Sequence, residues 1–283
     1  PSRTFDDAGV RNEDWFVTVG GDGFDPAVDP TDPDIVYSQW QHGGLVRFDR
    51  RSGEAIDIKP REREGDEPNV WNWDSPLLIS PHDPARLYFA GRKLFRSDDR
   101  GNSWRAVSPE LHRGLDRNTL EVMGKVQTPE ATAKHMSTSI YGNCVALSES
   151  PLVEGLLYVG TDDGLVQVSE NGGETWRKVE NFPVVPERTY VSCLAASPIS
   201  PDTVFATFDN HKVGDFKPYV LRSDDRGMTW KPIAGDLPER NTCYSIRQDP
   251  VKAEMLFVGT EYGAFASLDG GEKWWKVPGL PTI

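Results

Sequence analysis

Short apolar runs alternate along the chain with turns rich in Gly, Pro, Asp, Asn and Ser. One order of segments recurs: an apolar run ending in Ser-Pro or Asp-Pro, a polar turn, a run rich in Val, Leu, Tyr and Phe, a Gly turn, a third run, and a last run that starts at Trp. Short strands separated by turn signals at regular spacing are typical of all-β proteins. The pattern predicts four-stranded antiparallel sheets at residues 75–109, 138–181, 189–235 and 242–278, and a first one at residues 24–59.

The turn before each Trp run carries one motif, Ser-x-Asp-x-Gly-x-Thr-Trp, in four copies. Its Asp or Asn accepts backbone N–H groups of the turn, its Gly supplies a positive φ, and its Trp returns a large apolar group to the sheet. We therefore assign this motif, the Asp-box, a structural role and expect all copies on one face with their Trp side chains buried. The box residues are Asp99, Gly101, Trp104, Asn171, Gly173, Trp176, Asp225, Gly227, Trp230, Asp269, Gly271 and Trp274.

One motif per small sheet marks a radial array of blades, so we expect an all-β fold, a β-propeller of four-stranded antiparallel blades, with about five full blades. Residues 15–19 look like the last strand of a preceding blade, and residues 279–283 look like a linker into a following one. The whole of residues 1–283 is therefore predicted to be one propeller region that adjoins further blades or another domain of the same protein.

The loops divide between two faces. Each box joins the third strand of a blade to the fourth, so it shares a face with the turn between the first and second strands. The opposite face carries the long insertions, at residues 61–74, 110–136 and 209–217. Because binding residues of rigid scaffolds concentrate on such loops, we place the ligand-binding candidates there: Gln41, His42, Trp71, Trp73, Asp162, Asp163, Asp209, His211, Glu261 and Tyr262.

Two interpretations of these candidates stay open. Carboxylates gathered at the mouth of a propeller could form an acid/base pair, hold Ca²⁺ or accept sugar hydroxyls, but Asp and Asn also simply favour turns. Aromatic rings on the same face could stack on a sugar or a partner's side chain, whereas Trp71 and Trp73 could equally fill the gap between blades.

Composition excludes several classes of function. The 44 acidic and 31 basic residues give a net charge of −13, which argues against nucleic acid or anionic membranes as partners. No apolar run approaches the length of a membrane span. The five His show no metal-ligand spacing, so no metal site is predicted. The three Cys fall on the first strands of successive blades, too far apart to bridge, and are expected to be free thiols.

The boxes make the chain similar to the Asp-box, or BNR-repeat, β-propellers. Within that group the xyloglucanase-like hydrolases carry Gly-Gly-Gly-Gly-Phe and then Tyr-x-Arg-Thr-Asp-x-Gly-Gly, in which the Asp is catalytic. Here residues 20–24 read Gly-Gly-Asp-Gly-Phe and residues 37–44 read Tyr-Ser-Gln-Trp-Gln-His-Gly-Gly, which puts Gln41 where the resemblance implies the catalytic Asp. A neutral amide cannot replace a carboxylate as nucleophile or base.

A second resemblance is to the sortilin-like repeats of large bacterial proteins, carried by residues 158–167, 216–219 and 256–263. The arginine cluster and Arg-Ile-Pro motif of sialidases are not found. We therefore predict an extracytoplasmic or secreted sortilin-like propeller that binds a peptide or glycan on its loop-rich face. The alternative is a glycoside hydrolase, xyloglucanase-like or sialidase-like, with part of its catalytic site outside this chain.

Overall fold

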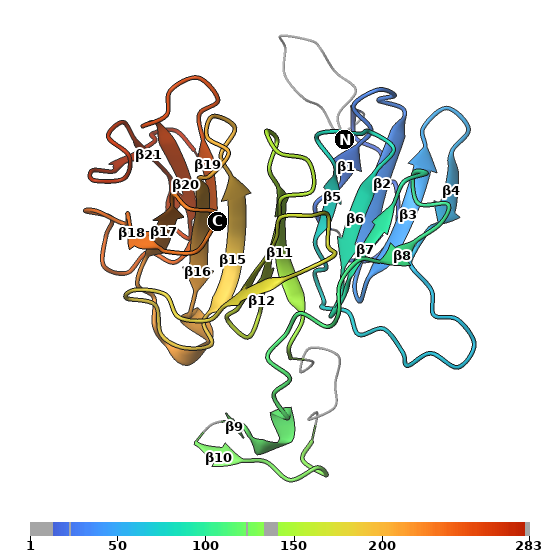
Figure 1. The fold of residues 1–283 in the computed structure, drawn as a ribbon, viewed down its shortest axis with the longest axis horizontal. Coiled ribbons are helices and arrows are strands. Elements are labelled where there is room, and N and C mark those ends of the chain that lie inside the picture. Colours follow the sequence, from blue (N-terminus) through green and yellow to red (C-terminus); the bar gives the residue numbers. More distant parts are fainter. Residues whose placement is uncertain (1–13, 23, 123, 133–140, 281–283) are drawn as a thin grey trace.

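The computed structural model describes residues 14–22, 24–122, 124–132 and 141–280. They form five four-stranded antiparallel sheets and one two-stranded sheet, with almost no helix (Figure 1). In every four-stranded sheet the strands pair in chain order, so each is an up-and-down sheet closed by tight turns. The predicted all-β fold of four-stranded antiparallel blades is confirmed.

The sheets follow the chain, one after another. The first two are β1 (Ala27–Val28), β2 (Ile35–Trp40), β3 (Gly44–Asp49) and β4 (Glu54–Asp57), then β5 (Leu77–Ile79), β6 (Leu87–Ala90), β7 (Leu94–Ser97) and β8 (Arg105–Ala106). The third and fourth are β11 (Cys144–Glu149), β12 (Leu157–Thr161), β13 (Val166–Ser169) and β14 (Arg177–Val179), then β15 (Tyr190–Ala196), β16 (Val204–Asp209), β17 (Tyr219–Ser223) and β18 (Lys231–Pro232). The fifth is β19 (Cys243–Gln248), β20 (Leu256–Thr260), β21 (Gly263–Ser267) and β22 (Trp275–Lys276).

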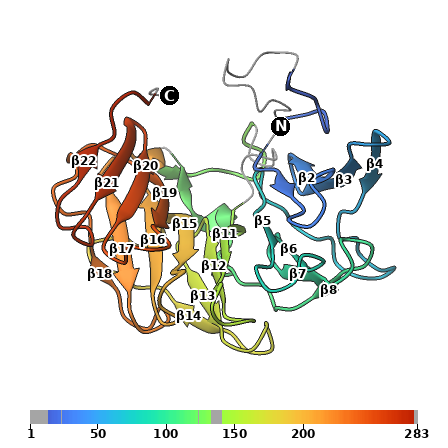
Figure 2. The same cartoon turned by 90° about the horizontal axis from the view of Figure 1, so that it is seen from above.

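Figure 2 shows these sheets set side by side around an arc, with β5, β11, β15 and β19 toward its inner side. The first strand of one sheet contacts the first strand of the next, as β11 does with β15 and β15 with β19. A blade inside the arc is covered on both faces, so its middle strands lose the alternation of apolar and polar residues. Every residue of β12, for example, is buried.

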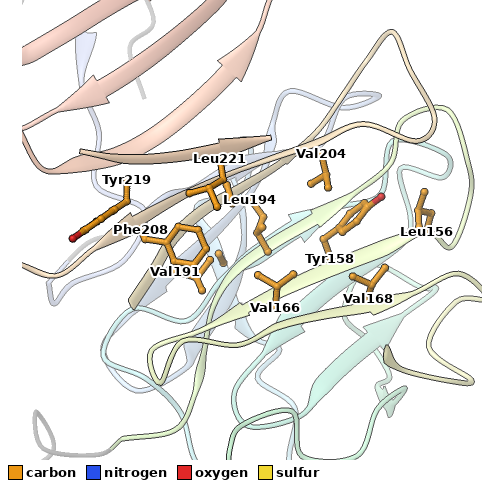
Figure 3. Close-up of a cluster of buried hydrophobic side chains, with 12 residues drawn as sticks. Leu156, Tyr158, Val166, Val168, Val191, Leu194, Val204, Phe208, Tyr219 and Leu221 are labelled. Carbon is orange, nitrogen blue, oxygen red and sulfur yellow. The ribbon is translucent and has the colours of Figure 1, made fainter. Parts of the chain in front are cut away.

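The hydrophobic core lies between neighbouring sheets. In the cluster of Figure 3, Tyr158 and Val166 of the third sheet pack against Val191, Phe208 and Leu221 of the fourth, and all five side chains are fully buried. Similar clusters join the first sheet to the second, the second to the third and the fourth to the fifth. Burial of apolar surface therefore stabilises pairs of blades, and a single blade has no core of its own.

The same hydrogen bonds close each Asp-box. The Ser97 hydroxyl accepts the N–H of Gly101 at 2.8 Å, and the Asp99 carboxylate accepts that of Ser103 at 2.8 Å. Corresponding bonds close the other three boxes. A backbone N–H of each box also donates to the turn between the first two strands of its own sheet, at the carbonyls of Ala85, Gly155, Asp202 and Glu254. In each of these four blades the box and this turn therefore lie at the same end, as the sequence predicts.

Three box tryptophans also bind the preceding sheet. Each donates its indole N–H to a backbone carbonyl just after the fourth strand of that sheet: Trp104 to Ile58 at 2.6 Å, Trp176 to Val107 at 3.2 Å and Trp274 to Ile233 at 3.1 Å. The box is thus a clasp between blades as well as a turn within one. Trp230 departs from this pattern and donates to Gly227 of its own box at 3.2 Å.

The sequence predicts that all four box tryptophans are buried. Of the four, only Trp274 is buried, at 7% exposed. Trp104, Trp176 and Trp230 are half-buried. The ring bridges the seam between two sheets near the box face, so one edge of it stays at the surface.

The expected strand at residues 15–19 is wrong. Trp15 makes one isolated bridge and residues 16–19 have no regular structure. Trp15 and Val17 are exposed, so a strand there would bury little apolar surface. Phe16 instead stacks on Phe48 of β3, with 6.1 Å between ring centroids. Residues 138–140 of the third predicted blade and 281–283 of the predicted linker lie outside the described residues.

The insertion after the second sheet contains a small hairpin that the sequence analysis did not anticipate. It consists of the 3-10 helix η2 (Arg117–Thr119) and the strands β9 (Glu121–Val122) and β10 (Lys125–Val126), and it projects away from the sheets (Figure 1). In the described part of the chain no helix has the length and apolar character needed to cross a membrane.

Replacing Trp274 by Ala is expected to lower the free energy of unfolding by about 3 to 5 kcal/mol, because it removes a buried aromatic ring and the bond to Ile233. Chemical denaturation of the wild type and the variant measures this loss. The exposed Met228 of the preceding box is the control, and Met228→Ala should change the free energy by less than about 0.5 kcal/mol. Equal losses for the two variants would contradict the role of the box tryptophan between blades.

Candidate functional site

A cleft of about 1020 Å³ lies at the centre of the arc. Its walls are the innermost strands of four sheets, β5, β11, β15 and β19. Residues 72–74 and 209–213, from two of the predicted insertions, form part of its rim. Four sheets thus wall the cleft, the first sheet adds Gln39 of β2 to its lining, and the rim includes loops that the sequence assigns to the functional face.

Three of the innermost strands carry a bulge at the same place. The pairing with the second strand shifts by one residue between Cys144 and Ala146, between Val191 and Cys193, and between Cys243 and Ser245. The extra residues are Val145, Ser192 and Tyr244, and all three line the cleft. Because a bulge redirects side chains and bends its strand, the repeated bulge shapes the wall of the cleft.

An acidic residue occupies the equivalent position of the second strand's end in the same three sheets. In each sheet, one residue of the second strand pairs with the first-strand residue just before the bulge, and the acidic residue follows it in the sequence. The pairing residues are Thr161, Phe208 and Thr260, and the acidic residues that follow them are Asp162, Asp209 and Glu261. Asp162 and Asp209 line the cleft. Glu261 does not belong to its lining and accepts the N–H of Thr242 at 3.3 Å.

Asp162 is held by three donors. Its Oδ1 accepts the backbone N–H groups of Gly142 and Asn143, each at 2.8 Å, and its Oδ2 accepts the Asn72 amide at 3.3 Å. The residue is 7% exposed. Burial raises the pKa of its carboxyl from 3.8 to about 7, and the neighbouring charge of Asp163 acts in the same direction, although the backbone N–H bonds oppose them.

Asp209 forms a pair with His211. The imidazole Nδ1 lies 2.6 Å from Asp209 Oδ1, and the same oxygen accepts the backbone N–H of His211 at 2.9 Å. His211 begins the 3-10 helix η4 (His211–Val213), and both side chains line the cleft. The structure thus brings together four predicted candidates, Trp73, Asp162, Asp209 and His211, on one cavity.

Asp163 is not available to a ligand. The sequence analysis placed it among the ligand-binding candidates of the loop-rich face, but it is fully buried. Its carboxylate accepts the Arg113 N–H at 2.8 Å and the Thr161 hydroxyl at 2.6 Å, and its carbonyl accepts the Arg113 guanidinium at 2.7 Å. Asp163 therefore anchors the start of the 110–136 insertion.

Trp71 is also a packing residue. The sequence left open whether it stacks on a ligand or fills the gap between blades, and the second interpretation is correct. It is 5% exposed and stacks on Phe89 and Phe95, with 4.9 and 5.6 Å between ring centroids. Gly43 has a φ of 71°, and a Cβ there would collide with the indole. The ring therefore fills the seam between the first and second sheets and cannot meet a sugar.

The neighbours of Trp71 lie nearer the surface. Trp73 lines the cleft, and the His42 ring meets it edge-on at 5.0 Å. Gln41 lies outside the cleft lining and binds Asp22 through its amide, with Nε2 3.2 Å from the carboxylate and Oε1 3.2 Å from the backbone N–H. Tyr262 is 48% exposed and also lies outside the lining.

Reasoning from sequence missed several residues that the cleft brings together. Asp25 and Asp74 both line it. Desolvation by the surrounding protein raises the pKa of the Asp74 carboxyl from 3.8 to about 6, and the charge of Asp25 adds to this effect. Asp74 nevertheless remains exposed to solvent. Tyr190 starts the bulged strand β15. Burial, then the charges of Asp162, Asp74 and Asp209, raise the pKa of its phenol far above 10.

Tyr190 therefore stays protonated and can donate a hydrogen bond amid carboxylates. In the sequence Tyr190 stands directly before an apolar run, and this position does not indicate that its side chain faces a cavity.

No group of three or more His, Cys, Asp or Glu side chains within the described ranges is arranged to hold a metal ion. The interpretation of the acidic turns as Ca²⁺ ligands therefore has no supporting geometry there. Cys144 and Cys243 are buried free thiols, whereas Cys193 is half-buried and lines the cleft.

The chain is similar to xyloglucanases. It is 26% identical over 278 residues to an oligoxyloglucan-reducing end-specific xyloglucanase of Emericella nidulans, a match that covers 90% of this chain and 30% of that protein. It is 27% identical over 239 residues to xyloglucanase Xgh74A of Acetivibrio thermocellus, covering 78% of this chain and 27% of that protein. The chain thus spans about a third or less of the length of these curated relatives. No protein-family model matches the chain.

Solved structures of GH74 enzymes share the fold. The GH74 xyloglucanase from Xanthomonas campestris superposes with a TM-score of 0.58 at 21% identity, over 90% of this chain and 38% of that one. An ancestral GH74 enzyme superposes with a TM-score of 0.53 at 18% identity, over 75% of this chain and 25% of that one. At this identity the likeness concerns the fold, and it agrees with the blade arrangement described above.

The raised pKa of Asp162 predicts a pH-dependent stability. A carboxyl whose folded pKa is raised contributes stability below its ordinary pKa of 3.8, and this contribution is lost as the pH rises through about 7. The Asp162→Asn variant keeps an acceptor for the two backbone N–H groups without the charge. Its free energy of unfolding relative to wild type should therefore rise by about 1 to 3 kcal/mol between pH 5 and pH 8.

Denaturation of both proteins at several pH values measures this difference. Asp99→Asn is the matched control, because hydrogen bonds from Ser103 lower the pKa of Asp99 and its charge is constant over that range. A flat difference for Asp162→Asn would show that its carboxylate is ionised throughout.

Proposed function

We propose that this chain forms the substrate-binding cleft of a glycoside hydrolase of the xyloglucanase kind. The observation that carries the proposal is the central cleft, in which Asp74, Asp162 and Asp209 surround the phenol of Tyr190 and the Trp73 ring completes the rim. Carboxylates and hydroxyls accept and donate hydrogen bonds to sugar hydroxyls, while aromatic rings offer planes to pyranose faces.

The sequence relatives support a glycan rather than a peptide as ligand. Both relatives described above are named xyloglucanases, and one is aligned over 90% of this chain. This favours the hydrolase alternative over the sortilin-like interpretation that the sequence analysis preferred. A polysaccharide ligand also supports a secreted or extracytoplasmic location, because such polymers do not cross membranes.

Hydrolysis requires a protonated carboxyl beside the leaving oxygen and a second carboxylate. The resemblance gives the catalytic position to Gln41, which has no carboxylate and is bound to Asp22 outside the cleft. Asp162 is fixed by three donors and barely exposed. Asp74 has a raised pKa and contact with solvent, so it is the residue of this chain best suited to act as general acid.

Binding of a xyloglucan oligosaccharide, measured by isothermal titration calorimetry, tests the proposal. Tyr190→Ala should weaken binding about five- to tenfold, since an aromatic contact contributes roughly 1 kcal/mol. Tyr262→Ala is the control, because this exposed ring lies outside the cleft, and it should leave the affinity unchanged.

Release of reducing ends from xyloglucan is measured alongside, and any turnover should be lost in Asp74→Asn. Absence of binding by the wild type, or equal effects of the two tyrosine variants, would overturn the assignment of the cleft.

A further inference from the structure

Three cations on the cleft wall have no ionic partner among the residues that the structure describes. Arg188, Lys212 and Arg247 all line the cavity and are exposed to solvent. Across the described residues, Arg86, Arg113 and Arg226 each reach at least two carboxylates, whereas none of the three cleft cations forms an ion pair. In a protein with 44 acidic and 31 basic residues, unpaired cations gathered on one cavity call for a functional explanation.

The structure holds each cation in place by contacts that leave its charge free. The Lys212 ammonium lies over the Tyr190 ring, 5.4 Å from its centroid. The Arg247 guanidinium donates from Nη1 to the Ile246 carbonyl at 2.7 Å and to Cys193 Sγ at 3.2 Å, which leaves its other two nitrogens, Nε and Nη2, for a ligand.

Arg188 is fixed through its backbone. Its φ is 62°, and it lies so close to Gly164 that a Cβ on that glycine would come within 2.7 Å of the Arg188 Cα atom. The side chain therefore starts from a defined point on the rim.

Among the described residues, none of the four carboxylates that line the cleft, Asp25, Asp74, Asp162 and Asp209, forms an ion pair with these cations, and two of the four are held by other groups. Asp162 accepts two backbone N–H groups and the Asn72 amide, and Asp209 binds His211. The cleft thus carries neutral-sugar acceptors in its depth and free positive charge on its wall. Guanidinium groups match carboxylates with two parallel hydrogen bonds, and such charge-assisted bonds are stronger than neutral ones.

We infer that the cleft recognises an anionic substituent, a carboxylate such as that of a uronic acid, on an otherwise neutral glycan chain. The inference rests on the proposed function, since it specifies the class of glycan that this same cleft takes. The net charge of −13 disfavours a polyanion, because a densely charged chain would be repelled by the rest of the surface. A mostly neutral glycan with isolated carboxylates satisfies both conditions.

The test compares a xyloglucan oligosaccharide with the same oligosaccharide after oxidation of part of its primary alcohols to carboxylates. By calorimetry at low ionic strength, the oxidised form should bind about tenfold more tightly, and added salt should reduce that preference. Arg247→Gln should remove most of the preference while leaving affinity for the neutral oligosaccharide within about twofold, and Lys212→Gln should reduce the preference as well. Lys252→Gln, on the box face, should leave both affinities unchanged.

Each outcome bears on a different claim. Equal binding of the two oligosaccharides by the wild type, with no effect of either cleft variant, would overturn the anionic subsite and leave the glycan cleft standing. Loss of preference in Lys252→Gln as well would also overturn it, because the effect would then come from overall charge. Failure to bind either oligosaccharide would overturn the proposed function itself.

Discussion

The bond from a box tryptophan to a carbonyl of the preceding sheet is the interaction on which the rest of the structure depends. It ties Trp104, Trp176 and Trp274 to the ends of the preceding blades, at the same edge that the box turns close. Every hydrophobic cluster also lies between two sheets. Because the blades are stable only as neighbours, their inner strands are fixed relative to one another, and a cleft between four blades can be preorganised.

Structural features that repeat from blade to blade also form the candidate site. A bulge at one register in β11, β15 and β19 directs Val145, Ser192 and Tyr244 toward the cleft, and the position beyond the paired strand is acidic in all three sheets. Each blade uses that acid differently. Asp162 caps backbone donors, Asp209 binds His211, and Glu261 caps Thr242 outside the cleft. Equivalent positions have thus acquired separate roles around one cavity, whereas the box face kept a single role.

Sequence patterns predicted the parts of the fold that local chemistry dictates. Turn residues and apolar runs gave the five sheets and the face of the boxes. They could not predict the burial of Asp163, because Arg113 arrives from a distant insertion, or that of Trp71, because the absence of a side chain at Gly43 makes room for it. Asp74 and Tyr190 were missed because the cleft forms between sheets. Asp74 precedes β5 in the second sheet and Tyr190 begins β15 in the fourth, and the spacing of apolar residues along one strand does not reveal which residues of separate sheets meet at one cavity.

The central claim is that ligands bind between the inner strands and not on the box face. Hydrogen–deuterium exchange with and without a saturating xyloglucan oligosaccharide tests it most directly. Slower exchange is expected in residues 72–78, 188–194 and 209–213, which wall the cleft, with no change in the box turns at residues 97–104 and 169–176. Protection confined to the box turns, or to the hairpin of β9 and β10, would contradict the account.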